Sequence, residues 1–161
     1  MPKLVQFTVA TVLLALSFHA CEAAAQLPEK KTLTLAAAEK IVEAAKAEAE
    51  RNGLAGVIAV VDDGGWLILL LRMDNAAYVA SVELAPGKAR TAALFKHPTE
   101  VLENAINQGR FSILSARDFT AMKGGFPIVV DGQVIGGIGA SFDTPEHDAQ
   151  IAQAGLAALA H

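Results

Sequence analysis

Two side chains in this sequence are of types that can ligate iron. His97 stands in LFKHPT, and Met122 stands in AMKGGFP beside a pair of glycines. Histidine and methionine both serve as axial ligands of haem iron in known classes of protein. A loop histidine can equally lie at the surface or cap a helix, and a methionine can equally fill a core. Both interpretations of each residue stay open on the sequence alone.

The motif GKARTA carries two cations, Lys88 and Arg90, in a stretch rich in alanine and leucine. Such cations can bind the propionates of a tetrapyrrole or another carboxylate ligand. The alternative is a salt bridge within the protein, for example to Asp148, since a charged residue on a mostly apolar helix usually has a partner. The sequence alone does not distinguish ligand binding from an internal salt bridge.

The stretch GGIGASFDTPEHDAQ, residues 136–150, combines glycines with acids and a histidine. Its glycines fall inside the second strand of a predicted hairpin, whereas a dinucleotide fingerprint needs a parallel βαβ unit, so a nucleotide cradle is disfavoured. Asp143 and His147 lack a third ligand, which disfavours a metal site. The segment Thr144-Pro145-Glu146 predicts a helix start, whose free amides could hold a carboxylate.

Hydrophobic periodicity predicts the helices that would position these residues. They extend from Thr34 to Asn52, over roughly 80–95, from Thr99 as N-cap to Gln108, and from Thr144 to about Ala160. Pro86 predicts that the second helix either begins near it or is kinked early. Residues 110–123 are interpreted as a short strand and a loop.

Apolar runs predict two hairpins. The first joins residues 56–61 and 66–71, and the second joins FPIVV to QVIGGIGAS through Asp131-Gly132, a pair typical of a type I′ turn. The strands of the first hairpin are continuously apolar rather than alternating. We therefore expect helices on both faces of the sheet.

The chain has 161 residues and a net charge of −4, and no basic cluster indicates a nucleic-acid partner. Residues 1–25 have the features of a secretory signal peptide: a positive charge at Lys3, an apolar stretch and a small-residue cleavage site. This predicts a linker over 26–33, one domain over 34–161 without a membrane span, and a secreted or periplasmic location after cleavage. Cys21, the single cysteine, would leave with the signal peptide.

Four segments together carry a resemblance to a known family. LTLAAAEKIVEAAKAEAERNG, IAVVDDGGWLILLLRMDNA, GKARTAALFKHPT and GGFPIVVDGQVIGGIGAS, in this order, are similar to the GlcG/HbpS family of haem-binding, or haem-degrading (DUF336), domains. The resemblance implies an α+β, profilin-like fold: an antiparallel sheet of about five strands with helices on both faces. It also implies a homo-oligomer that binds haem or a related tetrapyrrole, with a corrinoid as the alternative cofactor.

The family pattern matches this chain at several candidate binding residues. The matching candidates are Lys88, Arg90, Thr99, Gly124 and Gly125. His97 and Met122 are further candidates because their side chains can ligate iron, and His97 is the predicted ligand of the haem iron. The sequence departs from the pattern in two places. Pro86-Gly87 interrupts a usually continuous helix, and Ser141-Phe142-Asp143 replaces a glycine-containing turn, so that Phe142 could close the space that glycine leaves open.

Three functions agree with these observations. The first is an extracytoplasmic haem-binding protein that stores, buffers or senses haem. The second is an enzyme acting on haem or on a small carboxylate such as a glycolate-type acid. The third is an oligomeric scaffold without a ligand, since a high apolar content suits burial between subunits as well as burial of a ligand.

Overall fold

The computed structural model describes residues 29–159. The predicted signal peptide and residues 26–28 of the predicted linker lie outside the described residues, as do the last two residues. Within the described range, no helix is long and apolar enough to cross a membrane.

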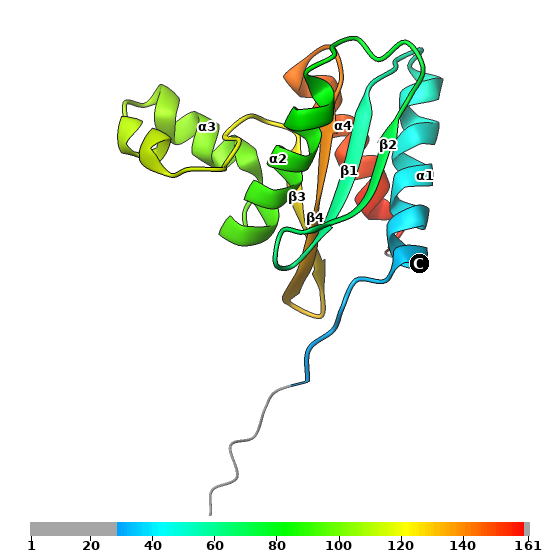
Figure 1. The fold of residues 1–161 in the computed structure, drawn as a ribbon, viewed down its shortest axis with the longest axis horizontal. Helices are drawn as coiled ribbons and strands as arrows, with labels where there is room; N and C mark the ends of the chain where they lie inside the picture. The colour runs from blue at the N-terminus through cyan, green and yellow to red at the C-terminus, as the bar shows by residue number, and fades with distance from the viewer. Residues whose placement is uncertain (1–28, 160–161) are drawn as a thin grey trace, which may run out of the picture.

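The centre of the molecule is an antiparallel sheet of four strands with the order β2-β1-β4-β3 (Figure 1). Its strands are β1 (Val57–Asp62), β2 (Leu67–Arg72), β3 (Gly125–Val130) and β4 (Gln133–Ser141). Both predicted hairpins are present, and the expected number of about five strands is corrected to four in the described residues. The predicted short strand within 110–123 is wrong, because this stretch contains the 3₁₀ helix η1 (Phe111–Ser115). A short apolar run does not by itself distinguish strand from helix.

Helices cover both faces of the sheet, as expected. On one face, α1 (Leu35–Arg51) and α4 (Pro145–Ala157) pack against each other and over the strands, and α2 (Ser81–Phe95) covers the other face (Figure 1). The predicted caps of α1 and α4 are confirmed. Thr34 accepts a hydrogen bond from the Ala37 N–H and Thr144 accepts one from the His147 N–H, both at 3.2 Å.

Helix α2 lies unusually close to β4. A Cβ atom on Gly139 would overlap the Ala85 carbonyl oxygen, and one on Gly137 would overlap that of Ala89. The helix begins at Ser81 and continues through Pro86, so a start at Pro86 is wrong. An interior proline costs about 3 kcal/mol, and burial of the alanine face of α2 against the sheet offsets that cost.

Residues 99–122 form an arm that projects from the body of the molecule (Figure 1). The arm contains α3 (Thr99–Asn107) and η1, and Thr99 is the one buried residue of α3. The apolar residues of the arm therefore do not belong to the main core. They instead border a cavity at the junction between arm and body.

Candidate functional site

A buried ion pair joins three elements beside the base of the arm. The Lys88 Nζ of α2 lies 2.5 Å from the Asp148 Oδ2 of α4 and donates to the Ala140 carbonyl of β4 at 3.2 Å. The side chains of Lys88 and Asp148 are only 2% and 8% exposed. The sequence interpretation of Lys88 as a salt-bridge partner of Asp148 is thus confirmed.

The Asp148 carboxylate experiences opposing influences. Burial raises its pKa above the ordinary aspartate value, while the Lys88 ammonium and the Phe142 N–H act in the opposite direction. The Phe142 N–H donates to Oδ1 at 2.5 Å, so each carboxylate oxygen has a partner. A carboxylate held in this way is well placed to orient the ammonium group.

Two glycines where β3 begins, Gly124 and Gly125, allow this segment to pack closely against the ion pair. Gly124 has φ +113°, and a Cβ there would lie 2.5 Å from the Cβ of Asp148 and 3.3 Å from the Lys88 Nζ. A Cβ on Gly125 would lie 2.5 Å from the Lys88 carbonyl oxygen. A side chain at Gly124 would displace this segment from α4, and one at Gly125 would displace it from α2.

Thr99 connects the arm to the start of β3. Its buried hydroxyl donates to the Met122 carbonyl at 2.5 Å and accepts from the Gly125 N–H at 2.9 Å. The prediction of Thr99 as the N-cap of its helix is wrong: Pro98 holds that position and Thr99 is the first helical residue. Its hydroxyl forms hydrogen bonds across to another segment instead of capping its own helix.

Replacement of Thr99 by valine is expected to lower the free energy of unfolding by about 1–3 kcal/mol, the cost of leaving buried polar groups without partners. Serine keeps the hydroxyl and is the matched control. Urea denaturation of the wild-type protein and both variants measures the difference. A Thr99→Val variant as stable as the wild type, together with a loss in Thr99→Ser, would show that the methyl group, and not the hydroxyl, supplies the stability.

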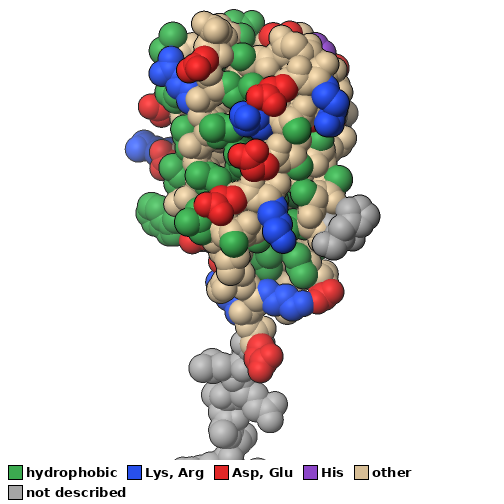
Figure 2. Space-filling view, turned by 90° about the vertical axis from the view of Figure 1, so that its right-hand side faces the viewer, with side chains coloured by type: hydrophobic (Ala, Val, Ile, Leu, Met, Phe, Trp, Pro, Cys, Tyr) green, Lys and Arg blue, Asp and Glu red, His purple; other side chains and the backbone are tan. Residues whose placement is uncertain are grey.

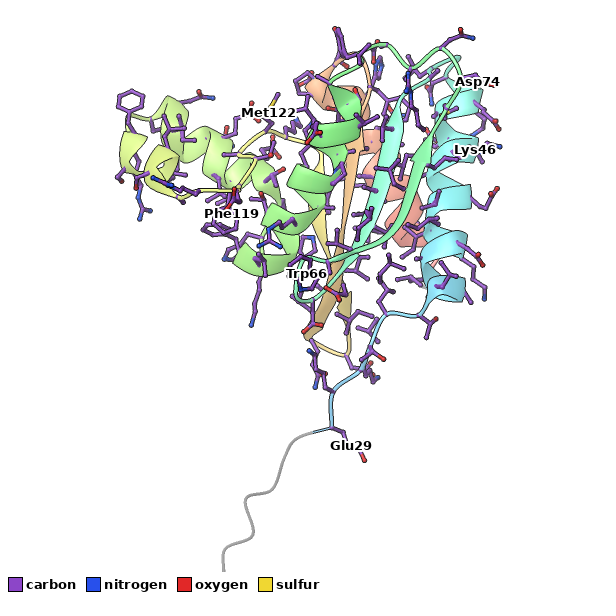
Figure 3. The ribbon with its side chains drawn as sticks, viewed as in Figure 1. Glu29, Lys46, Trp66, Asp74, Phe119 and Met122 are labelled. Carbon is purple, nitrogen blue, oxygen red and sulfur yellow. The ribbon has the colours of Figure 1, made fainter. Side chains whose placement is uncertain are left out.

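An apolar cavity of about 420 Å³ lies between the end of α2, the arm and the segment leading to β3. Phe95 and Phe119 form an edge-to-face pair in its wall, with centroids 4.8 Å apart and an interplanar angle of 81°. Figure 3 shows Phe119 and Met122 on the segment that follows η1. The lining residues are Phe95, Leu102, Glu103, Ile106, Asn107, Ile113, Leu114, Ala116, Phe119, Thr120, Ala121 and Met122.

A smaller cavity of about 110 Å³ lies beside the ion pair. Lys88, Asp148 and the buried Phe142 line it, and it shares Glu103 and Met122 with the apolar cavity. The two cavities are therefore neighbours. Phe142 fills space next to the ion pair, as its departure from the family pattern leads us to expect.

The structure brings five of the seven predicted site residues together: Lys88, Thr99, Met122, Gly124 and Gly125. His97 is exposed and lines neither cavity. The Arg90 guanidinium carbon lies 5.6 Å from the Trp66 ring centroid, at the β1–β2 turn. Figure 3 shows Trp66 and Met122 toward opposite ends of α2. Ligand binding by His97 and Arg90 stays a prediction.

Glu103 was not among the predicted site residues. It lines both cavities and accepts the Lys123 N–H through Oε2 at 2.8 Å. Its position on α3 offered a signal, because Leu102 precedes it and Ile106 follows one turn later. An acid bordering an apolar helical stripe lies at the edge of whatever that stripe contacts.

Comparison with known proteins identifies the relatives of this chain. Residues 33–157 match the family described as "Haem degrading protein HbpS-like". Protein GlcG of Escherichia coli K12 is 44% identical over 112 residues, which cover 70% of this chain and 83% of GlcG. The crystal structure of HbpS, 34% identical, has a TM-score of 0.78 and covers 84% of this chain and 96% of its own.

A crystal structure of a PduOC:haem complex is also similar. It is 32% identical with a TM-score of 0.72, and the match covers 80% of this chain and 95% of that one. These findings confirm the resemblance to the GlcG/HbpS family. The chain belongs to the HbpS-like family, described as haem-degrading proteins.

Proposed function

We propose that this protein binds haem, or a related tetrapyrrole, in the apolar cavity at the base of the arm. The observation that carries the proposal is a cavity of about 420 Å³ with aromatic walls and two potential iron ligands, Met122 and Glu103. Ligand cavities commonly measure about 300–1,000 Å³ and are mostly apolar with a few polar groups. The haem in the related PduOC complex adds support.

The residues of the cavity fit such a group. Apolar side chains from α2, α3 and η1 would contact the ring and exclude water, and the thioether of Met122, which is 43% exposed, lies at the cavity wall. Bound haem would supply a redox-active iron. Among the candidates from the sequence, Met122 therefore has more structural support as an iron ligand than His97, which lies outside this wall.

We further infer that the protein stores, buffers or senses haem outside the cytoplasm. The support for this location is the signal-like sequence of residues 1–25.

Self-association is part of the same proposal. Phe111 and Leu114 of η1 are each 66% exposed and Val79 is 80% exposed. Figure 2 shows only scattered hydrophobic side chains among charged ones on the side of the molecule that carries α1. The support for self-association is therefore the pair of exposed apolar side chains on η1, because contiguous apolar exposure is typical of interfaces.

A titration of the purified protein with hemin tests the binding proposal. We expect a saturable shift of the Soret band with hemin. After reduction with dithionite, we expect Met122→Ala to weaken binding of the ferrous haem by about tenfold and to change its Soret position. His97→Ala is the matched control and should bind like the wild type. A loss of binding in His97→Ala alone would assign the iron ligand to His97, and no saturable shift in the wild type would contradict the proposal.

The alternative proposal, an enzyme acting on a small carboxylate, is less well supported than tetrapyrrole binding. The evidence against it is the charge around the small cavity. Lys88 and Lys123 line this cavity, but each already forms an ion pair, Lys88 with Asp148 and Lys123 with Glu100. Three acids, Glu103, Asp143 and Asp148, line it as well. An anionic substrate would meet more negative than positive charge there, so the tetrapyrrole proposal is the better supported one.

A further inference from the structure

Glu103 is the one titratable side chain among the described residues that line the apolar cavity. It projects from α3 between Leu102 and Ile106, two further residues of the same wall. An ionised carboxylate next to apolar surface loses part of its hydration, which is costly unless the group gains a partner. The placement of Glu103 therefore suggests that its carboxylate has a binding role.

Only one of the two oxygens of the Glu103 carboxylate accepts a hydrogen bond from the described residues. Oε2 accepts the Lys123 N–H at 2.8 Å, and Oε1 accepts no hydrogen bond from the described residues. Glu100, one turn earlier on α3, differs from Glu103 in its ion pairing and in its position relative to the apolar cavity. Its carboxylate forms an ion pair with the Lys123 Nζ at 3.1 Å and does not line the apolar cavity.

Met122 lines both cavities together with Glu103. A carboxylate oxygen is a hard, anionic ligand and a thioether is a soft, neutral one, so the two favour different oxidation states of iron. Ferric haem accepts an anionic oxygen ligand in other proteins, as with the tyrosine of catalase. A ferric tetrapyrrole in this cavity would find that kind of ligand only in Glu103 among the described lining residues.

We propose that Glu103, through its free oxygen Oε1, is a ligand of the ferric iron when the apolar cavity holds a tetrapyrrole. This inference rests on the proposed function and deepens it. The hydrogen bond from the Lys123 N–H to Oε2 orients the carboxylate.

A comparison of two ligands with three proteins tests the inference. The ligands are hemin and metal-free protoporphyrin IX, and the proteins are the wild type, Glu103→Gln and the control Glu100→Gln. Glutamine keeps an acceptor for the Lys123 N–H but lacks the negative charge. We expect Glu103→Gln to weaken hemin binding by about tenfold or more and to shift the Soret band. Binding of protoporphyrin IX should not change, and Glu100→Gln should leave both ligands unaffected.

The outcomes separate the inference from the proposed function. If Glu103→Gln binds hemin like the wild type, the ligand assignment is wrong and haem binding stands. If the variant loses both ligands equally, Glu103 shapes the cavity and does not ligate iron, which also overturns the assignment. If the wild type binds neither ligand, both proposals fail. Far-UV circular dichroism and urea denaturation of each variant verify that it is folded.

Discussion

Replacement of Lys88 by methionine is expected to lower the free energy of unfolding by about 3–5 kcal/mol. The substitution removes the ammonium group that lies 2.5 Å from the Asp148 Oδ2 and leaves a buried carboxylate without its counter-charge. It also leaves the Ala140 carbonyl without the Lys88 donor. Equilibrium denaturation in urea at neutral pH measures the loss.

Two further variants make this first prediction specific. The double variant Lys88→Met/Asp148→Leu removes both charges and should recover much of the lost stability, because apolar residues of similar volume can replace a buried ion pair. Lys46→Met removes an exposed ion pair with Glu50 on α1 and should have no measurable effect. A double variant as unstable as Lys88→Met would show that the site cannot be filled by apolar groups.

Replacement of Gly139 by alanine is expected to cost about 3 kcal/mol of stability. The new Cβ would lie 2.6 Å from the Ala89 nitrogen and would overlap the Ala85 carbonyl oxygen, both in the backbone of α2. Backbone atoms cannot move aside as a flexible side chain can, so the whole helix must shift from the sheet. The same shift would displace Lys88, which lies on α2 between these contacts.

Thermal and urea denaturation of Gly139→Ala measure this cost. Gly64→Ala is the control, because a Cβ at that turn would lie 3.1 Å from the Trp66 Cδ1 and meets a side chain rather than a backbone. The control should unfold like the wild type to within about 0.5 kcal/mol. A Gly139→Ala variant as stable as this control would contradict the close contact between α2 and β4.

Much of the fold followed from local signals. The caps at Thr34 and Thr144 and the turn at Asp131-Gly132, with φ of +48° and +77°, depend on residues adjacent in the chain and were predicted correctly. The conformation of residues 110–123 was not. Their short apolar run follows no strong period, and its contacts with α3 decide that it is helical.

The candidate site was predictable only in part. The ion pair was suggested because a charged residue on a mostly apolar helix usually has a partner, although Lys88 and Asp148 are 60 positions apart. Arg90 was expected to act with Lys88, but residues two positions apart on a helix point to different sides, about 200° apart. The structure accordingly directs Arg90 to Trp66 at the β1–β2 turn.

The sequence by itself determined the four α-helices, the two hairpins, the covering of the sheet on both faces and membership of the family. These features depend on residue periodicity, on turn residues and on motifs in a given order. Only the tertiary structure decided where the apolar cavity lies and that Glu103 lines it. The cavity walls come from α2, α3, η1 and the segment before β3, and no spacing within one of these segments specifies how closely it approaches the others.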